Sequence, residues 1–523
     1  MRYPPATSRA ILGTGVAVFI IGLLSYQHSF GTGNSLSSTP TFSKNTICYV
    51  WHGQQLYQEL YDDFEEATES LSVGYANTLG NPRRCLRGSS RLYQHQITPG
   101  HNWSELEWGF IQRQCVASEH KLLASEDDPH QIWRRPAKPQ TVQTSSGKRT
   151  VIVLRTWDDY EYTEKRLAWL RTLIAEVSLQ RPGKYQVFFL VNVKDPNIQL
   201  EEDDDAYEQA LRQFVPEEFR DMALLFNERT LKAWYPLVPE HGAQDQMYQA
   251  LQIFSQKFQQ YDYIWQLEMD LRFTSHIHDT LQSATAFARA QRRRNLWERN
   301  GRFYIPHLYN TFENFSAAVD AEFGETGIWG PVATSDFIPK GPQPEKRANA
   351  GWGIGEEADL ISFMPMIDPI GTNWVYEDGI HNFEDGSDTP RRVAIVSITR
   401  SSRRLLQLVS DAQLARGQWL VSEATLETFA LLHGLKAVTV PHPILFSKET
   451  RMEDLLADIN KGPPHSKAGG DSPSMLYTKN GFLPGPWWEA SYWFTGNGAA
   501  KLWDEYVNGR QLPPMLLHPV KEK

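Results

Sequence analysis

The sequence predicts an α/β fold in which helices flank an open, mostly parallel sheet. Three short apolar runs have the length of buried strands: RTVIVLR, which ends at Arg155, and the runs over residues 185–195 and 263–273. The segments between them carry apolar residues at helical spacing, so strand and helix alternate along the chain. Because ligands of such sheets bind beyond the carboxyl ends of the strands, a site is expected there.

Composition supports a globular protein and argues against one class of partner. Hydrophobic residues make up 41% of the 523 residues and charged residues 22%, which is enough apolar material for a core. The net charge is −10, and no long basic run alternates with aromatic residues. Nucleic acid is therefore not expected as a partner.

The N-terminal segment predicts a membrane anchor. Residues 10–26 are uncharged and mostly apolar, and they approach the length of a transmembrane helix. Arg2 and Arg9 precede them, and no Lys or Arg follows until Lys44. The positive-inside rule then places residues 1–9 in the cytoplasm and the rest of the chain in a lumen, as in a single-pass type II protein. A cleaved signal peptide is the alternative, although no small-residue cleavage site is obvious after the apolar core.

The remaining chain divides into four parts. Residues 27–45 are rich in Ser, Gly and Thr and are expected to form a flexible stem. Residues 46–147 are an N-terminal lumenal region with a linker, and residues 148–510 carry the α/β pattern. Residues 511–523 are expected to be a C-terminal tail.

Cysteines and glycosylation sequons agree with a lumenal location. The three cysteines are Cys48, Cys85 and Cys115, and in an oxidising lumen two of them can pair. We predict the pair Cys85–Cys115. The sequons at Asn102 and Asn314 permit N-glycosylation.

Two amphipathic helices are expected between the strands. The apolar face of the first carries Leu167, Leu170, Leu173, Ile174 and Val177. The apolar face of the second carries Met247, Ala250, Leu251, Phe254 and Phe258. Asp245, near the start of the second helix, is a candidate cofactor-binding residue. The acidic run over residues 201–205 is expected to be a solvated turn.

Two acids stand in the third expected strand. Side chains alternate along a strand, so Glu268 and Asp270 share one face of the run 263–273. Two close anions repel each other unless a cation joins them, and Mg²⁺ or Mn²⁺ prefers oxygen ligands. Such a pair is typical of the strand-end motif of nucleotide-sugar transferases, where a metal bridges protein and diphosphate. The alternative is a polar strand face in water, with Arg272 pairing one acid.

Further acids and a histidine are candidates in the second half of the chain. Glu356 and Glu357, in GEEADL, follow a glycine-rich turn and either cap a helix start or act on an acceptor hydroxyl. Glu423 begins a helix and is either a first-turn acid or a catalytic group. His442 follows the short strand AVTV and is either a turn residue or a metal ligand.

An arginine-rich segment is the remaining candidate. Its side chains either clamp phosphate or form a solvated basic face, and Arg299 is the candidate cofactor-binding residue among them. The arginines of this cluster are Arg292, Arg293, Arg294, Arg299 and Arg302. No Gly-x-Ser-x-Gly motif is present and no Cys lies in the α/β region, so serine or cysteine hydrolase chemistry has no sequence support.

Several longer motifs resemble one family over residues 45–510. The motifs are LRTWDDYEYT, YQVFFLVNVKD, WQLEMDLRFTSH, LWERNGRFYIP, GEEADLISFMPMIDP and HGLKAVTVPHP. They resemble the fungal domain-of-unknown-function 3405 family, whose members look like type II membrane proteins. This resemblance implies no activity.

A second resemblance concerns the acidic strand. YDYIWQLEMDLRFTSHI is similar to the strand motif of the fungal Golgi α-1,2-mannosyltransferases. Trp265 and Glu268 match that motif, whereas Gln266 and Met269 replace its arginine and proline. The resemblance implies that Glu268 helps to hold manganese and that a later histidine, for which His442 is the candidate, completes the site.

Together these features predict a GT-A-like glycosyltransferase with an N-terminal anchor in the Golgi or another secretory-pathway membrane. It would move a sugar from a nucleotide sugar to a glycan or glycoprotein. Alternatives are a non-catalytic lumenal protein that binds glycans or partners on the same fold, and a metal-dependent hydrolase. The expected ligands of Mn²⁺ or Mg²⁺ are Glu268, Asp270 and His442. The expected cofactor-binding residues are Arg155, Asp245 and Arg299, and the expected catalytic residues are Glu356, Glu357 and Glu423.

Overall fold

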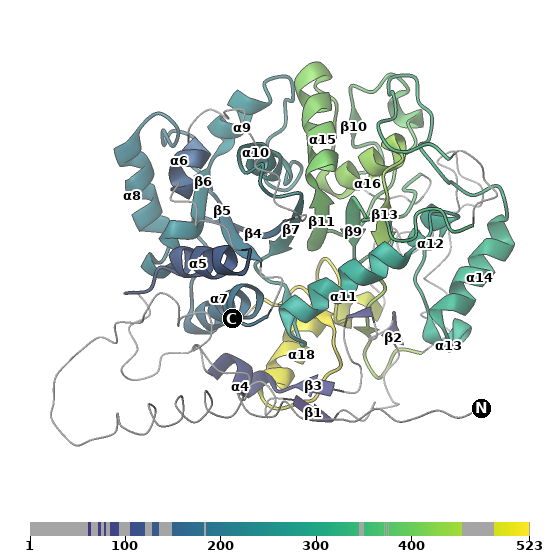
Figure 1. Cartoon of the computed structure of the whole chain (residues 1–523), viewed down its shortest axis with the longest axis horizontal. Helices are drawn as coiled ribbons and strands as arrows, with labels where there is room; N and C mark the ends of the chain where they lie inside the picture. Colours follow the sequence, from purple (N-terminus) through teal and green to yellow (C-terminus); the bar gives the residue numbers. More distant parts are fainter. Residues whose placement is uncertain are drawn as a thin grey trace, which may run out of the picture. The chain divides into compact units, whose positions relative to one another are not determined.

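A computed structural model gives the course of most of the chain (Figure 1). It describes residues 61–63, 72–74, 78–79, 84–93, 105–120, 128–134, 149–181, 185–344, 350–370, 372, 374, 376–451 and 486–521. Within these residues no helix has both the length and the apolar character needed to cross a membrane. Residues 10–26 lie outside the described part, so the anchor stays a prediction.

Seven strands form the central sheet, in the order β13-β9-β11-β7-β4-β5-β6. They are β4 (Thr150–Trp157), β5 (Gln186–Asn192), β6 (Ala223–Phe226), β7 (Tyr263–Glu268), β9 (Leu360–Ser362), β11 (Ile398–Ser402) and β13 (Ala437–Thr439). Neighbouring strands are parallel except at β11, which runs antiparallel to both β7 and β9. The predicted α/β fold with a mostly parallel sheet is confirmed.

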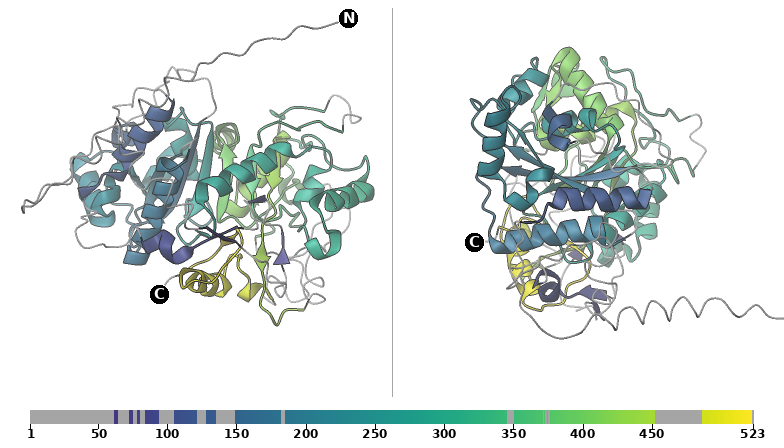
Figure 2. Two further views of the ribbon diagram at one scale, coloured as in Figure 1. Left: turned by 60° about the horizontal axis from the view of Figure 1, so that its bottom comes forward. Right: turned by 60° about the vertical axis from the view of Figure 1, so that its left-hand side comes forward.

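Helices cover both faces of this sheet (Figures 1 and 2). One face carries α10 (Gln249–Lys257), α15 (Arg403–Arg416) and α16 (Ser422–His433), and the other carries α5 (Trp108–His120), α7 (Glu164–Ile174) and α11 (Ile277–Ala290). The remaining described α-helices are α4 (Gly88–Tyr93), α6 (Pro129–Arg134), α8 (Asp204–Phe214), α9 (Glu228–Trp234), α12 (Leu296–Asn300), α13 (Pro306–Tyr309), α14 (Phe312–Phe323) and α18 (Gly498–Val507).

In the described part of the chain, four pairs of short strands lie outside the central sheet, and all four are antiparallel. They are β1 (Tyr61–Asp63) with β3 (Arg84–Leu86), β2 (Ser72–Val73) with β14 (Ile444–Leu445), β8 (Arg272–Phe273) with β15 (Leu516–Leu517), and β10 (Ile380–His381) with β12 (Trp419–Leu420).

The expected elements between residues 150 and 260 form where their patterns place them. The apolar runs become β4 and β5, whose central residues are buried on both faces, as is usual for parallel strands. The first amphipathic segment forms α7, which the side chain of Thr163 caps, and continues as a π-helical turn, Ala175–Leu179. The second forms α10. The acidic run 201–205 is exposed, and its Asp203 caps α8.

The order of the strands creates a switch point beside β4. The chain passes from β4 to β5 and on to β6, and it then returns to place β7 on the opposite side of β4. In open α/β sheets, ligands bind at the carboxyl ends of the strands where the order reverses in this way. The ends of β4 and β7 are therefore the expected place for a site.

The third expected strand is shorter than predicted. The run 263–273 is not one strand, because β7 ends at Glu268 and β8 begins at Arg272. A turn separates them, in which the backbone amide of Leu271 donates to the carbonyl of Glu268 at 3.3 Å. Arg272 is buried and donates to the carbonyls of Met269 and Leu271. Strand alternation therefore does not by itself explain why the two acids lie close together.

The predicted disulfide Cys85–Cys115 is wrong. Cys85 is buried and is not disulfide-bonded, and its sulfur accepts a hydrogen bond from the backbone amide of Leu512 at 3.3 Å. Cys115 is disulfide-bonded, and its partner lies outside the described residues. Of the two sequons, Asn314 is exposed on α14, and Asn102 lies outside the described residues.

Candidate functional site

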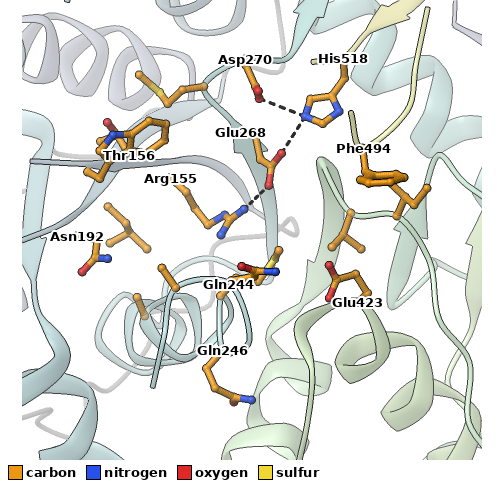
Figure 3. Close-up of a pocket in the computed structure, with 18 of the residues that line it drawn as sticks. Arg155, Thr156, Asn192, Gln244, Gln246, Glu268, Asp270, Glu423, Phe494 and His518 are labelled. Atoms are coloured by element: carbon orange, nitrogen blue, oxygen red, sulfur yellow. Dashed lines mark hydrogen bonds and ion pairs between the residues drawn. The ribbon is translucent and has the colours of Figure 1, made fainter. Parts of the chain in front are cut away.

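The candidate site is a cavity of about 860 Å³ at the carboxyl ends of β4 to β7 (Figure 3). Arg155 on β4 and Glu268 on β7 are neighbours across the parallel ladder, and both side chains reach this cavity. The cavity therefore lies at the switch point that the strand order creates.

The C-terminal segment completes this site. Strand β15 pairs with β8 immediately after Asp270, with Leu517 opposite Arg272. His518 follows β15, and the backbone amide of Val520 donates to the carbonyl of Asp270 at 2.8 Å. This pairing brings the imidazole of His518 beside the two acids.

Three side chains converge at the head of the cavity. His518 Nε2 donates to Glu268 Oε2 at 2.9 Å and lies 3.2 Å from Asp270 Oδ1. The guanidinium of Arg155 pairs with the other oxygen of Glu268. One ligand atom from each of Glu268, Asp270 and His518 lies within 4.8 Å of the other two.

This arrangement fits a divalent metal ion. Two carboxylates and an imidazole are ligands that Mn²⁺ accepts. His518 Nδ1 donates to the carbonyl of Trp493 at 2.6 Å. Such a bond fixes the ring and leaves Nε2 as the atom that can face an ion.

The electrostatics of the three groups are coupled. Burial lowers the pKa of His518, but hydrogen bonds and charge from Asp270 and Glu268 outweigh it and raise that pKa to about 10. Burial raises the pKa of Asp270, and His518 and Arg272 outweigh it, so the pKa of Asp270 is lowered. The two acids thus favour the protonated imidazolium, which is a cation between them.

Glu423 lies in the same cavity, apart from the three convergent groups (Figure 3). It stands in the first turn of α16 and is half-buried. Among the described residues, no other residue donates a hydrogen bond to its carboxylate. Burial raises its pKa, and the charges of Asp245 and Glu268 raise it further, whereas Arg155 lowers it. An acid of this kind, facing a cavity without a partner, is suited to accept a proton.

The match with a known family covers most of the chain. The family model described as protein of unknown function (DUF3405) matches residues 72–522. The chain belongs to the DUF3405 family. A comparison with curated proteins found no match. The resemblance of the longer motifs to this family is confirmed, whereas the likeness to the α-1,2-mannosyltransferases stays a prediction.

In this DUF3405 chain, five of the predicted site residues gather at or near the cavity. Arg155, Glu268, Asp270 and Glu423 line it. Asp245 is half-buried in the segment before α10, and its charge acts on Glu423. These residues come from the ends of β4 and β7 and from the starts of α10 and α16.

Glu356 and Glu357 lie away from this cavity. Together with Asp359 they line a second cavity, which includes Tyr263 at the opposite end of β7. Glu356 forms two bonds of 2.7 Å with the guanidinium of Arg293, and Glu357 pairs with Arg400 at 2.8 Å. No helix begins at these acids, because β9 follows them, and their partners are already arginines.

Each arginine of the cluster has partners in its own surroundings, and Arg293 and Arg299 are buried. Arg299 is buried outside the main cavity, and its guanidinium donates to the carbonyls of Arg294 and Arg292 at 2.6 and 2.7 Å. It also lies 3.6 Å from Asp320. Each of the other four arginines of the cluster pairs with an acid of its own surroundings.

The structure does not bring His442 to the two acids. Its ring is buried, with Phe363 and Tyr492 edge-on at centroid distances of 5.8 and 4.7 Å. Burial lowers its pKa to about 3, which keeps the ring neutral. Tyr492 also contacts the ring of His518, so it lies between the two histidines.

His518 lies at the site, and it was not singled out from the sequence. It stands in LLHPV, and His442 stands in TVPHP. Both histidines therefore follow a short apolar strand and precede a proline. The pattern that singled out His442 was present at His518 too, in the segment assigned to a C-terminal tail.

Proposed function

We propose that this DUF3405 protein is a metal-dependent glycosyltransferase with a GT-A-like fold. It moves a sugar from a nucleotide sugar to a hydroxyl group of a glycan or glycoprotein. The observation that carries the proposal is the convergence of Glu268, Asp270 and His518 at the switch point between β4 and β7. The reversed strand β11, next to parallel strands of the described sheet, also supports a GT-A-like arrangement.

Glu268, Asp270 and His518 would hold Mn²⁺ or Mg²⁺. The ion would supply positive charge for the diphosphate of the donor. The chain adds cations of its own, since Arg155, Lys194 and Lys521 line the same cavity. They attract a diphosphate, and Arg155 also fixes the orientation of Glu268.

Glu423 is the proposed base of the transfer. The acceptor oxygen forms a bond to the anomeric carbon of the donor sugar while the bond from that carbon to the diphosphate oxygen breaks. The electron pair of the broken bond leaves with the diphosphate, and the hydroxyl proton passes to Glu423. A half-buried acid with a raised pKa is suited to this role.

The proposed place of action is the lumen of the Golgi or another secretory-pathway compartment. The support is the predicted anchor at residues 10–26 and the disulfide at Cys115, because disulfides form in oxidising compartments.

Calorimetric titration of the full-length chain against a panel of nucleoside diphosphates, with and without Mn²⁺, tests the proposal. We expect manganese-dependent binding of one nucleotide. Glu268→Gln should abolish that binding, because it removes one metal-binding charge. Glu313→Gln, which changes an exposed acid on α14, is the matched control and should bind as the parent does.

The other outcomes separate the alternatives. Metal binding without nucleotide affinity would favour a metal-dependent hydrolase. A folded chain that binds neither would contradict the proposal and favour a non-catalytic lumenal protein that binds glycans or partners.

A further inference from the structure

The main cavity has two chemically different walls on either side of Glu268 (Figure 3). One wall is built from the ends of β4 and β5 and carries Arg155, Asn192 and Lys194. The opposite wall is built from residues 393–396, the start of α16 and the segment around Phe494. The first wall also carries Trp157 and Leu190, but its two cations, Arg155 and Lys194, suit a charged donor.

The opposite wall is aromatic and apolar. Phe494 exposes 38% of its surface and packs on Trp493 at a centroid distance of 5.3 Å. Tyr376 lies on the same cavity, and its hydroxyl accepts a hydrogen bond from Gln244 at 3.0 Å. Aromatic faces held in this way offer flat apolar surface to a ring-shaped ligand.

Two acids, Glu423 and Asp245, place negative charge at or near this wall. Glu423 faces the cavity, and Asp245 is close enough for its charge to act on Glu423 and on Tyr376. Two carboxylates disfavour an anionic ligand, and a carboxylate without a partner accepts a hydrogen bond from a hydroxyl group. The ligand that fits is a ring with hydroxyl groups and no negative charge.

We propose that this wall binds the acceptor and that the acceptor is a neutral carbohydrate. A sugar ring packs on Phe494 and Tyr376, and one of its hydroxyl groups donates to Glu423. Acidic sugars bind more weakly at this wall, because Glu423 and Asp245 repel their carboxylates. That the bound sugar is the acceptor rests on the proposed function. The binding of the sugar can be measured without donor or metal.

The test is direct titration of the full-length chain with neutral disaccharides (lactose, mannobiose and cellobiose) and with their uronic-acid counterparts. We expect at least one neutral sugar to bind, and to bind at least tenfold more tightly than its acidic counterpart. Phe494→Ala should weaken that binding at least tenfold. Phe110→Ala, which changes a phenylalanine of similar exposure on α5, is the matched control.

Glu423→Gln tests the charge argument separately. This substitution should reduce the difference in binding affinity between neutral and acidic sugars, because it removes the repelling charge and keeps the shape of the side chain. Equal binding of neutral and acidic sugars by the parent, or no effect of Phe494→Ala in a folded variant, would overturn the inference.

The failure of this inference and that of the proposed function can be told apart. Manganese-dependent nucleotide binding without affinity for any sugar would contradict the acceptor wall alone. Binding of a neutral sugar without binding of a nucleotide would support the proposed sugar-binding wall and contradict the proposed glycosyltransferase function.

Discussion

At the residue scale, two histidines with the same sequence signature have different surroundings. His518 contacts two carboxylates and Trp493, whereas His442 is enclosed by aromatic rings. The acids Glu268 and Asp270 could be identified from sequence because charges in an apolar strand are costly to bury. The local sequence could not show which histidine lies beside these acids, because the pairing of β8 with β15 decides it.

Substituting each histidine in turn should show which of the two contributes to metal binding. His518→Gln is expected to weaken Mn²⁺ binding by about 100-fold or more, since even the loss of a supporting group around a metal costs about 10–100-fold. His442→Phe should leave it unchanged. Titration with Mn²⁺ measures both, and a larger loss in His442→Phe would contradict the assignment.

His442 should make the fold sensitive to acid. Its folded-state pKa of about 3 lies below the ordinary value of 6.5. Between these values the unfolded chain binds a proton that the folded chain does not, so stability falls as the pH drops from about 6.5 toward 3.

In His442→Phe this contribution disappears. The decrease in unfolding free energy from pH 7 to pH 5 should be smaller by about 2 kcal/mol than in the parent. Urea unfolding at both pH values measures the difference, and equal decreases in both proteins would refute the prediction.

At the scale of elements, apolar strands could be predicted from the sequence, whereas a polar strand could not. β4, β5 and β13 are continuous apolar runs, and each was expected from the sequence. β11 reads ITRSS and is fully buried. Its Arg400 stacks on Tyr263 and pairs with Glu357, so tertiary partners make a polar strand tolerable in the interior. These partners are distant in the sequence, so no local pattern predicts them.

The short pair of β8 and β15 should couple stability to metal binding. Leu517 is fully buried in β15, so Leu517→Ala should lower the unfolding free energy by about 2–5 kcal/mol. It should also weaken Mn²⁺ binding, because β15 positions His518. Thermal unfolding and metal titration measure the two effects.

Leu308→Ala, at an exposed position, is the control for this substitution. A destabilised Leu517→Ala protein that keeps full metal affinity at low temperature would show that β15 does not position the ligand.

At the scale of the whole molecule, buried ion pairs join the N-terminal region to the sheet layer. Arg91 pairs with Glu176 through two bonds, and neither side chain is exposed. Arg171 on α7 pairs with Glu218, which also accepts a bond from Trp108 on α5. The order of the strands and these contacts join residues far apart in the chain, so neither could be predicted from local sequence.

Breaking one such pair should be costly. Arg171→Met leaves Glu218 buried without its cation and should lower the unfolding free energy by about 3–5 kcal/mol. The double variant Arg171→Met, Glu218→Met should recover part of that loss, since it removes the uncompensated charge. Denaturant unfolding of both variants checks this, and a double variant less stable than Arg171→Met would contradict it.

The metal-site candidates Glu268 and His518 lie 250 residues apart in the chain. At about 5–20 residues per second, a ribosome needs roughly 10–50 s to pass from one to the other. During that interval the growing chain carries both acids of the cavity without the imidazole. Strands β4 to β7 all precede the histidine in the chain, so the proposed metal site can form only after these core strands have been made.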